Sequence, residues 1–114
     1  MSERIKIRIK EGNEVRHTFN LKNYRTNGPA DVSSAAEIRI EWEDPDGVDQ
    51  TAIVLSDAEP GADWANGQVV WFVRPPVTTG IGDKPFGLTV VINGETITYE
   101  VGDVIVGDRP GVTT

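Results

Sequence analysis

Strict alternation of apolar and polar residues is the dominant pattern of this chain. Residues 4–10 show it most clearly, because three isoleucines alternate there with lysines and arginines. A period of two residues with β-branched side chains is typical of a strand that buries one face. The same pattern, bounded by turns rich in Gly, Pro and Asn, predicts further strands. These cover residues 15–21, 37–43, 50–55, 68–74, 86–92 and 97–106.

The segments predict an all-β fold of about seven strands, arranged as an antiparallel two-sheet sandwich or a small barrel. No stretch shows the pattern of an amphipathic helix, and Asn93-Gly94 is the strongest hairpin signal. We expect the first two strands to form a hairpin across the turn at residues 11–13. The continuously apolar strand 68–74 is expected to be central, and residues 102–103 to form a kink or bulge.

Length and composition agree with one domain. The chain has 114 residues, near the commonest domain size. We expect a β-sandwich over residues 1–106 and a polar tail over residues 107–114. The apolar runs are too short to span a bilayer, and the first residues lack the apolar region of a secretory signal. With 18 acidic and 11 basic residues, the net charge of −7 argues against a main role in binding nucleic acid or anionic membranes.

Little in the sequence indicates catalysis, and no cofactor is expected. The absence of cysteine excludes disulfides, thiol nucleophiles and zinc–thiolate sites. The single histidine, His17, lies within a predicted strand, and no Gly-x-Ser-x-Gly motif accompanies it. Gly80-Ile81-Gly82 lacks the strand–glycine–helix context of a phosphate-binding loop. The sequence therefore favours a protein that is not an enzyme.

Carboxylates in residues 41–49 leave two alternatives open. Paired carboxylates can act as acid and base on a sugar, although their alternation with apolar residues is typical of a solvated strand face. Asp44-Pro45-Asp46-Gly47 resembles the start of a calcium loop, but Val48 and Leu55 occupy positions where an EF-hand needs oxygen ligands. The same residues fit a type I turn. The alternatives are a small hydrolase and a weak calcium site at Asp44, Asp46 and Asp49.

The three tryptophans allow a further alternative, a carbohydrate-binding or surface-adhesion module. Trp42 and Trp71 lie within predicted strands and are expected in the core. Trp64 lies in the polar loop 56–67, where it either contacts a partner or closes the end of the core. The glycan alternative requires an exposed Trp64.

Charge is unevenly distributed along the chain. The first 26 residues hold seven basic and three acidic side chains, whereas the remainder is strongly acidic. Lysines on an edge strand often serve only to prevent aggregation. Alternatively, a basic outer face on the first hairpin would bind an acidic surface of a neighbouring copy or another protein. The candidate interaction residues are Arg4, Lys6, Arg8 and Lys10, with Trp64 and Ile81 as apolar anchors.

Several short motifs occur in a familiar order. They are Phe19-Asn20-Leu21, Asn27-Gly28-Pro29, Asp44-Pro45-Asp46-Gly47 and the closing hairpin from Phe86 to Val106. In this order they resemble the immunoglobulin-like domain of tailed-phage baseplate upper proteins and related virion modules. Pro29 to Ala35 and Gly82 to Phe86 occupy the places of that family's motifs before the third strand and the final hairpin. The resemblance implies an immunoglobulin-like sandwich and no catalytic residues.

We therefore expect a non-enzymatic virion structural protein, made in the host cytoplasm without a secretion signal. It would dock in multiple copies as a capsid decoration (cement) protein or as a tail or baseplate component. Its partners would be other virion proteins and copies of itself, with a glycan contact as the alternative. No nucleic acid or membrane partner is expected.

Overall fold

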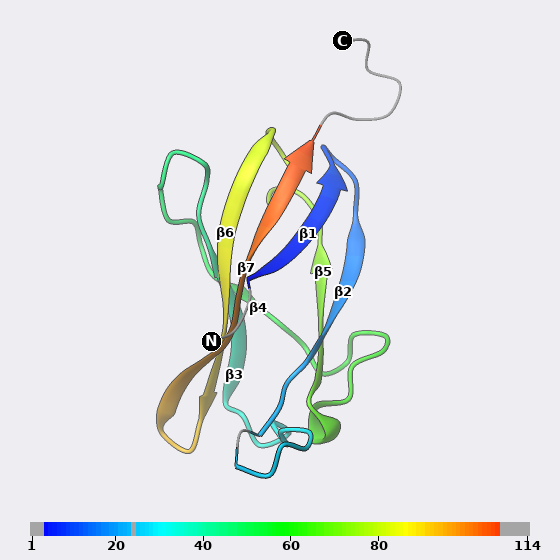
Figure 1. The fold of residues 1–114 in the computed structure, drawn as a ribbon, viewed down its shortest axis with the longest axis vertical. Coiled ribbons are helices and arrows are strands. Elements are labelled where there is room, and N and C mark those ends of the chain that lie inside the picture. Colours follow the sequence, from blue (N-terminus) through cyan, green and yellow to red (C-terminus); the bar gives the residue numbers. More distant parts are fainter. Residues whose placement is uncertain (1–3, 24, 108–114) are drawn as a thin grey trace.

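A computed structural model describes residues 4–23 and 25–107 of the protein, which form two packed β-sheets (Figure 1). One sheet has five strands in the order β1-β7-β6-β3-β4, and the other pairs β2 with β5. The elements are β1 (Ile5–Lys10), β2 (Val15–Asn20), β3 (Glu37–Trp42), β4 (Ile53–Val54), the 3-10 turn η1 (Trp64–Asn66), β5 (Gln68–Val73), β6 (Gly82–Ile92) and β7 (Glu95–Gly107). The predicted all-β sandwich is confirmed.

The division of the strands between the two sheets resembles that of immunoglobulin domains. The second and fifth strands share one sheet, and the third, sixth and seventh share the other, as strands B and E and strands C, F and G do in immunoglobulin domains. The five-stranded sheet is mixed, because β1 runs parallel to β7 from Ile5 opposite Gly102 to Lys10 opposite Gly107. The prediction of purely antiparallel sheets is wrong at this pair.

The predicted hairpin of the first two strands is also wrong, because β1 and β2 belong to different sheets. The turn between them is closed by the Asn13 amide, which donates to the Lys10 carbonyl at 3.0 Å. Gly102 explains the close approach of β7 to β1, since a Cβ there would lie 2.3 Å from the Ile5 carbonyl oxygen. Alternation determines which face of a strand is buried, but it does not select the pairing strand.

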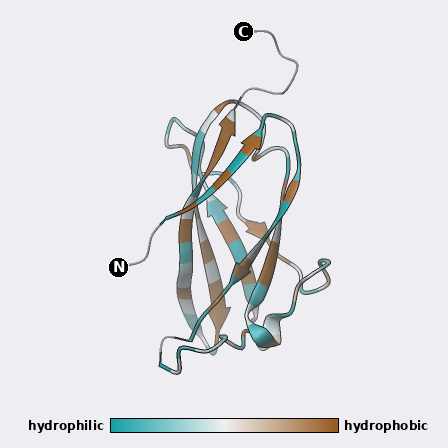
Figure 2. Cartoon of the chain, turned by 45° about the vertical axis from the view of Figure 1, so that its right-hand side comes forward, coloured by the Kyte–Doolittle hydropathy of each residue, from teal (hydrophilic) through white to brown (hydrophobic). Residues whose placement is uncertain are grey.

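The core lies between the inner faces of the two sheets, where apolar residues recur at every second position (Figure 2). Trp42 and Trp71 are both buried, as predicted. Ile7 is buried, while Ile5 and Ile9 are only partly buried at the edge of the core. The other large buried side chains are Phe19, Leu21, Val32, Ile38, Ile40, Val69, Val73, Val77, Phe86, Leu88, Val90, Val104 and Val106.

Among the described strands, β5, which was predicted to be central, pairs with β2 alone. Its continuous apolar character has another cause, which is the chain segment that covers its outer face. Asp63 and Gln68 exchange backbone hydrogen bonds along the outer edge of β5. A Cβ on Gly61 would lie 3.7 Å from the side chain of Val70, which is 1% exposed. Val70 is therefore buried by a loop and not by a further strand.

The closing hairpin has the predicted turn at Asn93-Gly94, both with positive φ. Its strands are longer than expected, since β6 begins at Gly82. The register shifts between Leu88 and Thr89, and no shift occurs at residues 102–103, where a kink was predicted. Gly107 belongs to β7, and the rest of the predicted tail, residues 108–114, lies outside the described residues.

We predict that Gly102→Ala lowers the free energy of unfolding by about 1–3 kcal/mol, because the added methyl group meets the Ile5 carbonyl and the Phe86 ring. Gly107→Ala is the matched control, since a Cβ there meets nothing within 4 Å, and its effect should stay within about 0.5 kcal/mol. Urea unfolding of the three proteins measures the difference. Equal stabilities would contradict the close packing of β1 on β7.

Candidate functional site

Three cationic side chains lie in a row on the first strand of the five-stranded sheet. Lys6, Arg8 and Lys10 are exposed on the outer face of β1. Among the residues that the structure describes, none of the three forms a salt bridge. Since β1 is the last strand of its sheet, we call these three residues the basic edge. They remain available for an anionic partner.

Arg4, also predicted to contact a partner, is already engaged within the chain. Its guanidinium donates to both carboxylate oxygens of Asp103 and to the carbonyl of Gly102, each at 3.0 Å. The hydrogen bond from Arg4 is the main reason why the pKa of Asp103 lies below its usual range, and the charges of Arg4 and Lys6 add to the effect. Arg4 thus joins the start of β1 to β7.

Acidic side chains gather near the other edge of the same sheet. Glu41, Glu43 and Asp49 line a groove of about 490 Å³, which extends past Gly87 and Val101 as far as Arg4. Hydrogen bonding to Asp49 is the main cause that raises the pKa of Glu43 above its ordinary value. We call these three carboxylates the acidic groove. A cationic side chain placed there would relieve the repulsion between Glu43 and Asp49.

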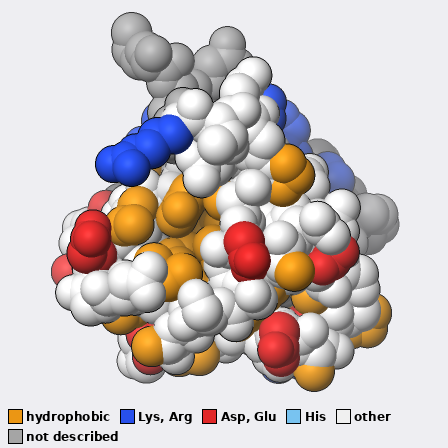
Figure 3. Space-filling view, turned by 90° about the horizontal axis from the view of Figure 1, so that it is seen from below, with side chains coloured by type: hydrophobic (Ala, Val, Ile, Leu, Met, Phe, Trp, Pro, Cys, Tyr) orange, Lys and Arg blue, Asp and Glu red, His pale blue; other side chains and the backbone are white. Residues whose placement is uncertain are grey.

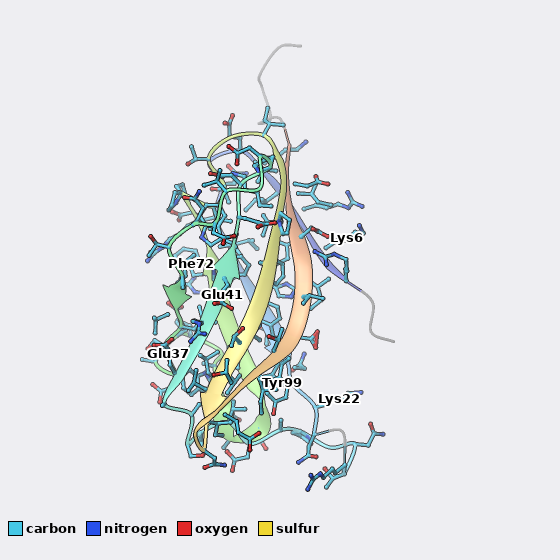
Figure 4. The ribbon with its side chains drawn as sticks, turned by 90° about the vertical axis from the view of Figure 1, so that its left-hand side faces the viewer. Lys6, Lys22, Glu37, Glu41, Phe72 and Tyr99 are labelled. Carbon is cyan, nitrogen blue, oxygen red and sulfur yellow. The ribbon has the colours of Figure 1, made fainter. Side chains whose placement is uncertain are left out.

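The basic edge and the acidic groove lie on opposite sides of the sheet, with β7 and β6 between β1 and β3. Figure 4 shows this separation, with Glu41 on β3 and Lys6 on the far side of β7. Along β3, Arg39 forms ion pairs with Glu37 at 2.9 Å and with Glu41 at 3.4 Å. Glu43 and Asp49 form no ion pair within the described part of the chain.

The carboxylates considered for calcium serve the turn in which they lie. Asp46 accepts a hydrogen bond from the Val48 amide at 3.1 Å, and Asp44 accepts one from the Gln50 side chain at 2.8 Å. Asp49 instead pairs with Glu43 across an isolated bridge. Across residues 4–23 and 25–107, no three carboxylate or imidazole groups converge to hold a metal ion.

The two predicted apolar anchors lie at opposite ends of the sandwich. Trp64 begins η1 at the lower end (Figure 1), packs partly buried against the core, and its carbonyl accepts the Val32 amide at 2.9 Å. At that end, hydrophobic side chains gather centrally with acidic ones around them (Figure 3). Ile81 is 57% exposed just before β6, at the same end as Lys10. The structure therefore brings Ile81, but not Trp64, near the basic edge.

His17 lies on the inward side of β2, opposite Trp71. It is half-buried, and its ring packs edge-on against Phe19 at a centroid distance of 4.7 Å. Burial lowers the pKa of His17. This is the packing of a strand histidine that contributes to the interior.

Sequence reasoning missed the buried lysine of β6. Lys84 is 1% exposed, and its ammonium donates to the carbonyls of Val77, at 2.8 Å, and Thr79. Desolvation lowers the pKa of Lys84, while the charges of Asp44, 3.9 Å away, and Glu11 oppose this effect. Lys84 thereby organises the loop before β6, including the segment that carries the exposed Ile81. The sequence signal for its burial is that Lys84 lies at the same alternate positions of the strand as the apolar Phe86 and Leu88.

No protein-family model matches the chain, and no curated protein matches it in sequence. The resemblance to baseplate domains therefore stays a prediction. Within the described residues, no helix has the length and apolar character needed to cross a membrane.

We predict that Asp103→Asn makes stability less sensitive to acid. Because Arg4 lowers the pKa of Asp103 in the folded chain, the pair stabilises the protein above the unfolded pKa of aspartate, about 4. That contribution is lost as the pH falls through the lowered pKa. Urea unfolding at neutral and acidic pH measures it, with Asp57→Asn in the exposed 56–62 loop as control. An unchanged acid dependence would contradict the ion pair.

We predict that Lys84→Met lowers the free energy of unfolding by about 1–3 kcal/mol, because the carbonyls of Val77 and Thr79 lose their donor. Lys22→Met removes an exposed lysine outside the basic edge and is the matched control. Thermal unfolding compares the two variants. If Lys84→Met is as stable as the wild-type protein, the ammonium does not support the loop.

Proposed function

We propose that the chain is a non-enzymatic structural component of a tailed-phage particle, where it docks in multiple copies on a larger assembly. The immunoglobulin-like sandwich supplies a rigid frame of the kind that the sequence resemblance implies. On this frame the basic edge of one copy would bind an acidic surface of its neighbour, such as the acidic groove. Contacts of this head-to-tail kind repeat from copy to copy and build rings or lattices.

The observation that carries the proposal is the separation of uncompensated charge across one sheet. Within the described residues Lys6, Arg8 and Lys10 form no salt bridge, although Lys6 lies opposite Asp103, and neither Glu43 nor Asp49 forms one. Within one copy, β7 and β6 separate the basic edge from these carboxylates, so the two groups would attract each other between copies. Such complementarity orients partners and speeds their encounter more than it adds affinity.

We predict salt-sensitive self-association of the purified chain. The molar mass from light scattering after size-exclusion chromatography should exceed that of a monomer at low salt. It should fall to the monomer at high salt, because the Debye length shrinks to about 3 Å at 1 M. Arg8→Glu should weaken association on the order of tenfold, whereas Arg74→Glu, just beyond the end of β5 in the other sheet, should not. A monomer at every salt concentration, at high protein concentration, would contradict the contact between copies.

The particle itself provides a second test. Phage particles purified from the source of the sequence should contain the chain in many copies, and high salt should release it in part. Particles that lack the chain altogether would contradict the assignment to a virion.

A further inference from the structure

The backbone of β1 is open along the side that faces away from β7. β1 is the last strand of its sheet, and within the described ranges no strand pairs with its outer side. The Glu11 amide donates to the Gly107 carbonyl at 2.8 Å, so residues of the same parity as Glu11 direct their backbone groups toward β7. The amides and carbonyls of Lys6 and Arg8 therefore point outward, and no backbone group of the described residues bonds to them.

The side chains around this open edge differ on the two faces. On the outer face lie the cationic side chains of the basic edge. On the inner face lie Ile5 and Ile9, which pack against the core but stay partly exposed. A hollow of about 290 Å³ lies over the paired ends of β1 and β7, beside Arg8, Lys10 and Ile105. An added strand would thus meet cations on one face and aliphatic groups on the other.

We infer that β1 is an acceptor for an extended acidic segment of a partner protein, which adds to the five-stranded sheet as a sixth strand. Acidic residues at alternate positions would pair with Lys6, Arg8 and Lys10. The intervening apolar residues would cover Ile5 and Ile9, and the outward backbone groups of Lys6 and Arg8 would form the ladder. This inference rests on the proposed function, since it specifies how the basic edge would bind another protein of the assembly, as distinct from the acidic groove of a second copy.

Charge argues for an acidic partner and against pairing of β1 with β1 of a second copy. In such a pair the lysines and arginines of both strands would lie opposite one another, and like charges directly opposite destabilise a sheet. The cations of the basic edge therefore disfavour pairing with a basic strand and favour pairing with an acidic one. The competing explanation is that these cations act as a general barrier to strand addition. Even in that role they would not repel an acidic strand.

The test uses a short peptide of alternating glutamate and valine, added to the full chain at low salt. It should bind, and exchange of the Lys6 and Arg8 amides, followed by NMR, should slow by about tenfold or more. The matched peptide with lysine in place of glutamate should not bind. Arg8→Gln should weaken binding by removing a charge. Arg8→Pro should weaken it further, because proline also removes the outward amide, a change that edge strands tolerate.

Two outcomes would overturn the inference. One is failure of the glutamate–valine peptide to bind. The other is binding that leaves exchange of the Lys6 and Arg8 amides unchanged, which would mean attraction between charges without strand addition. The second result would leave the proposed function intact, provided that the chain still self-associates at low salt. In the converse result, the peptide protects the two amides, but the chain stays monomeric and is absent from particles. That result would support strand addition and would contradict only the proposed function.

Discussion

Parallel pairing of β1 with β7 is the contact on which the surface of this protein depends. It removes the first strand from its neighbour in sequence, β2, and makes it the edge of the larger sheet. Gly102 permits the approach, and the bidentate contact of Arg4 with Asp103 holds the beginning of the strand. The cations that follow then lie beside an open backbone edge, instead of on the face of a hairpin.

Charge within the sandwich follows a clear division between structural and available groups. Arg4 and Lys84 are engaged with carbonyls and carboxylates of their own chain, and both connect segments far apart in sequence. Lys6, Arg8 and Lys10 are not so engaged. Lys84 also organises the loop that leads to Ile81, near the end of β1. The cations that support the fold are therefore distinct from those that we propose to bind a partner.

Much of the fold was predictable from local patterns, because alternation reports burial directly. The seven strands occur in the predicted segments, although the segment 50–55 forms a strand only at Ile53–Val54. The Asn93-Gly94 turn and the buried Trp42 and Trp71 also agree with the sequence analysis. Pairing was not predictable, since the contact of Arg4 with Asp103 joins residues 99 positions apart. Because a loop buries Val70 on the outer face of β5, the sequence of this strand is as continuously apolar as that of a central strand. The basic edge was found from charge alone, but the engagement of Arg4 and the separation of Trp64 from Ile81 needed the structure.

The central claim is that Lys6 and Arg8 carry outward, unpaired backbone groups beside their cationic side chains. Hydrogen exchange of single amides in the free chain tests this most directly. The amides of Ile7 and Ile9, which face β7, should exchange at least about tenfold more slowly than those of Lys6 and Arg8. Equal protection of all four amides would mean that both sides of β1 are already paired, and it would contradict the account.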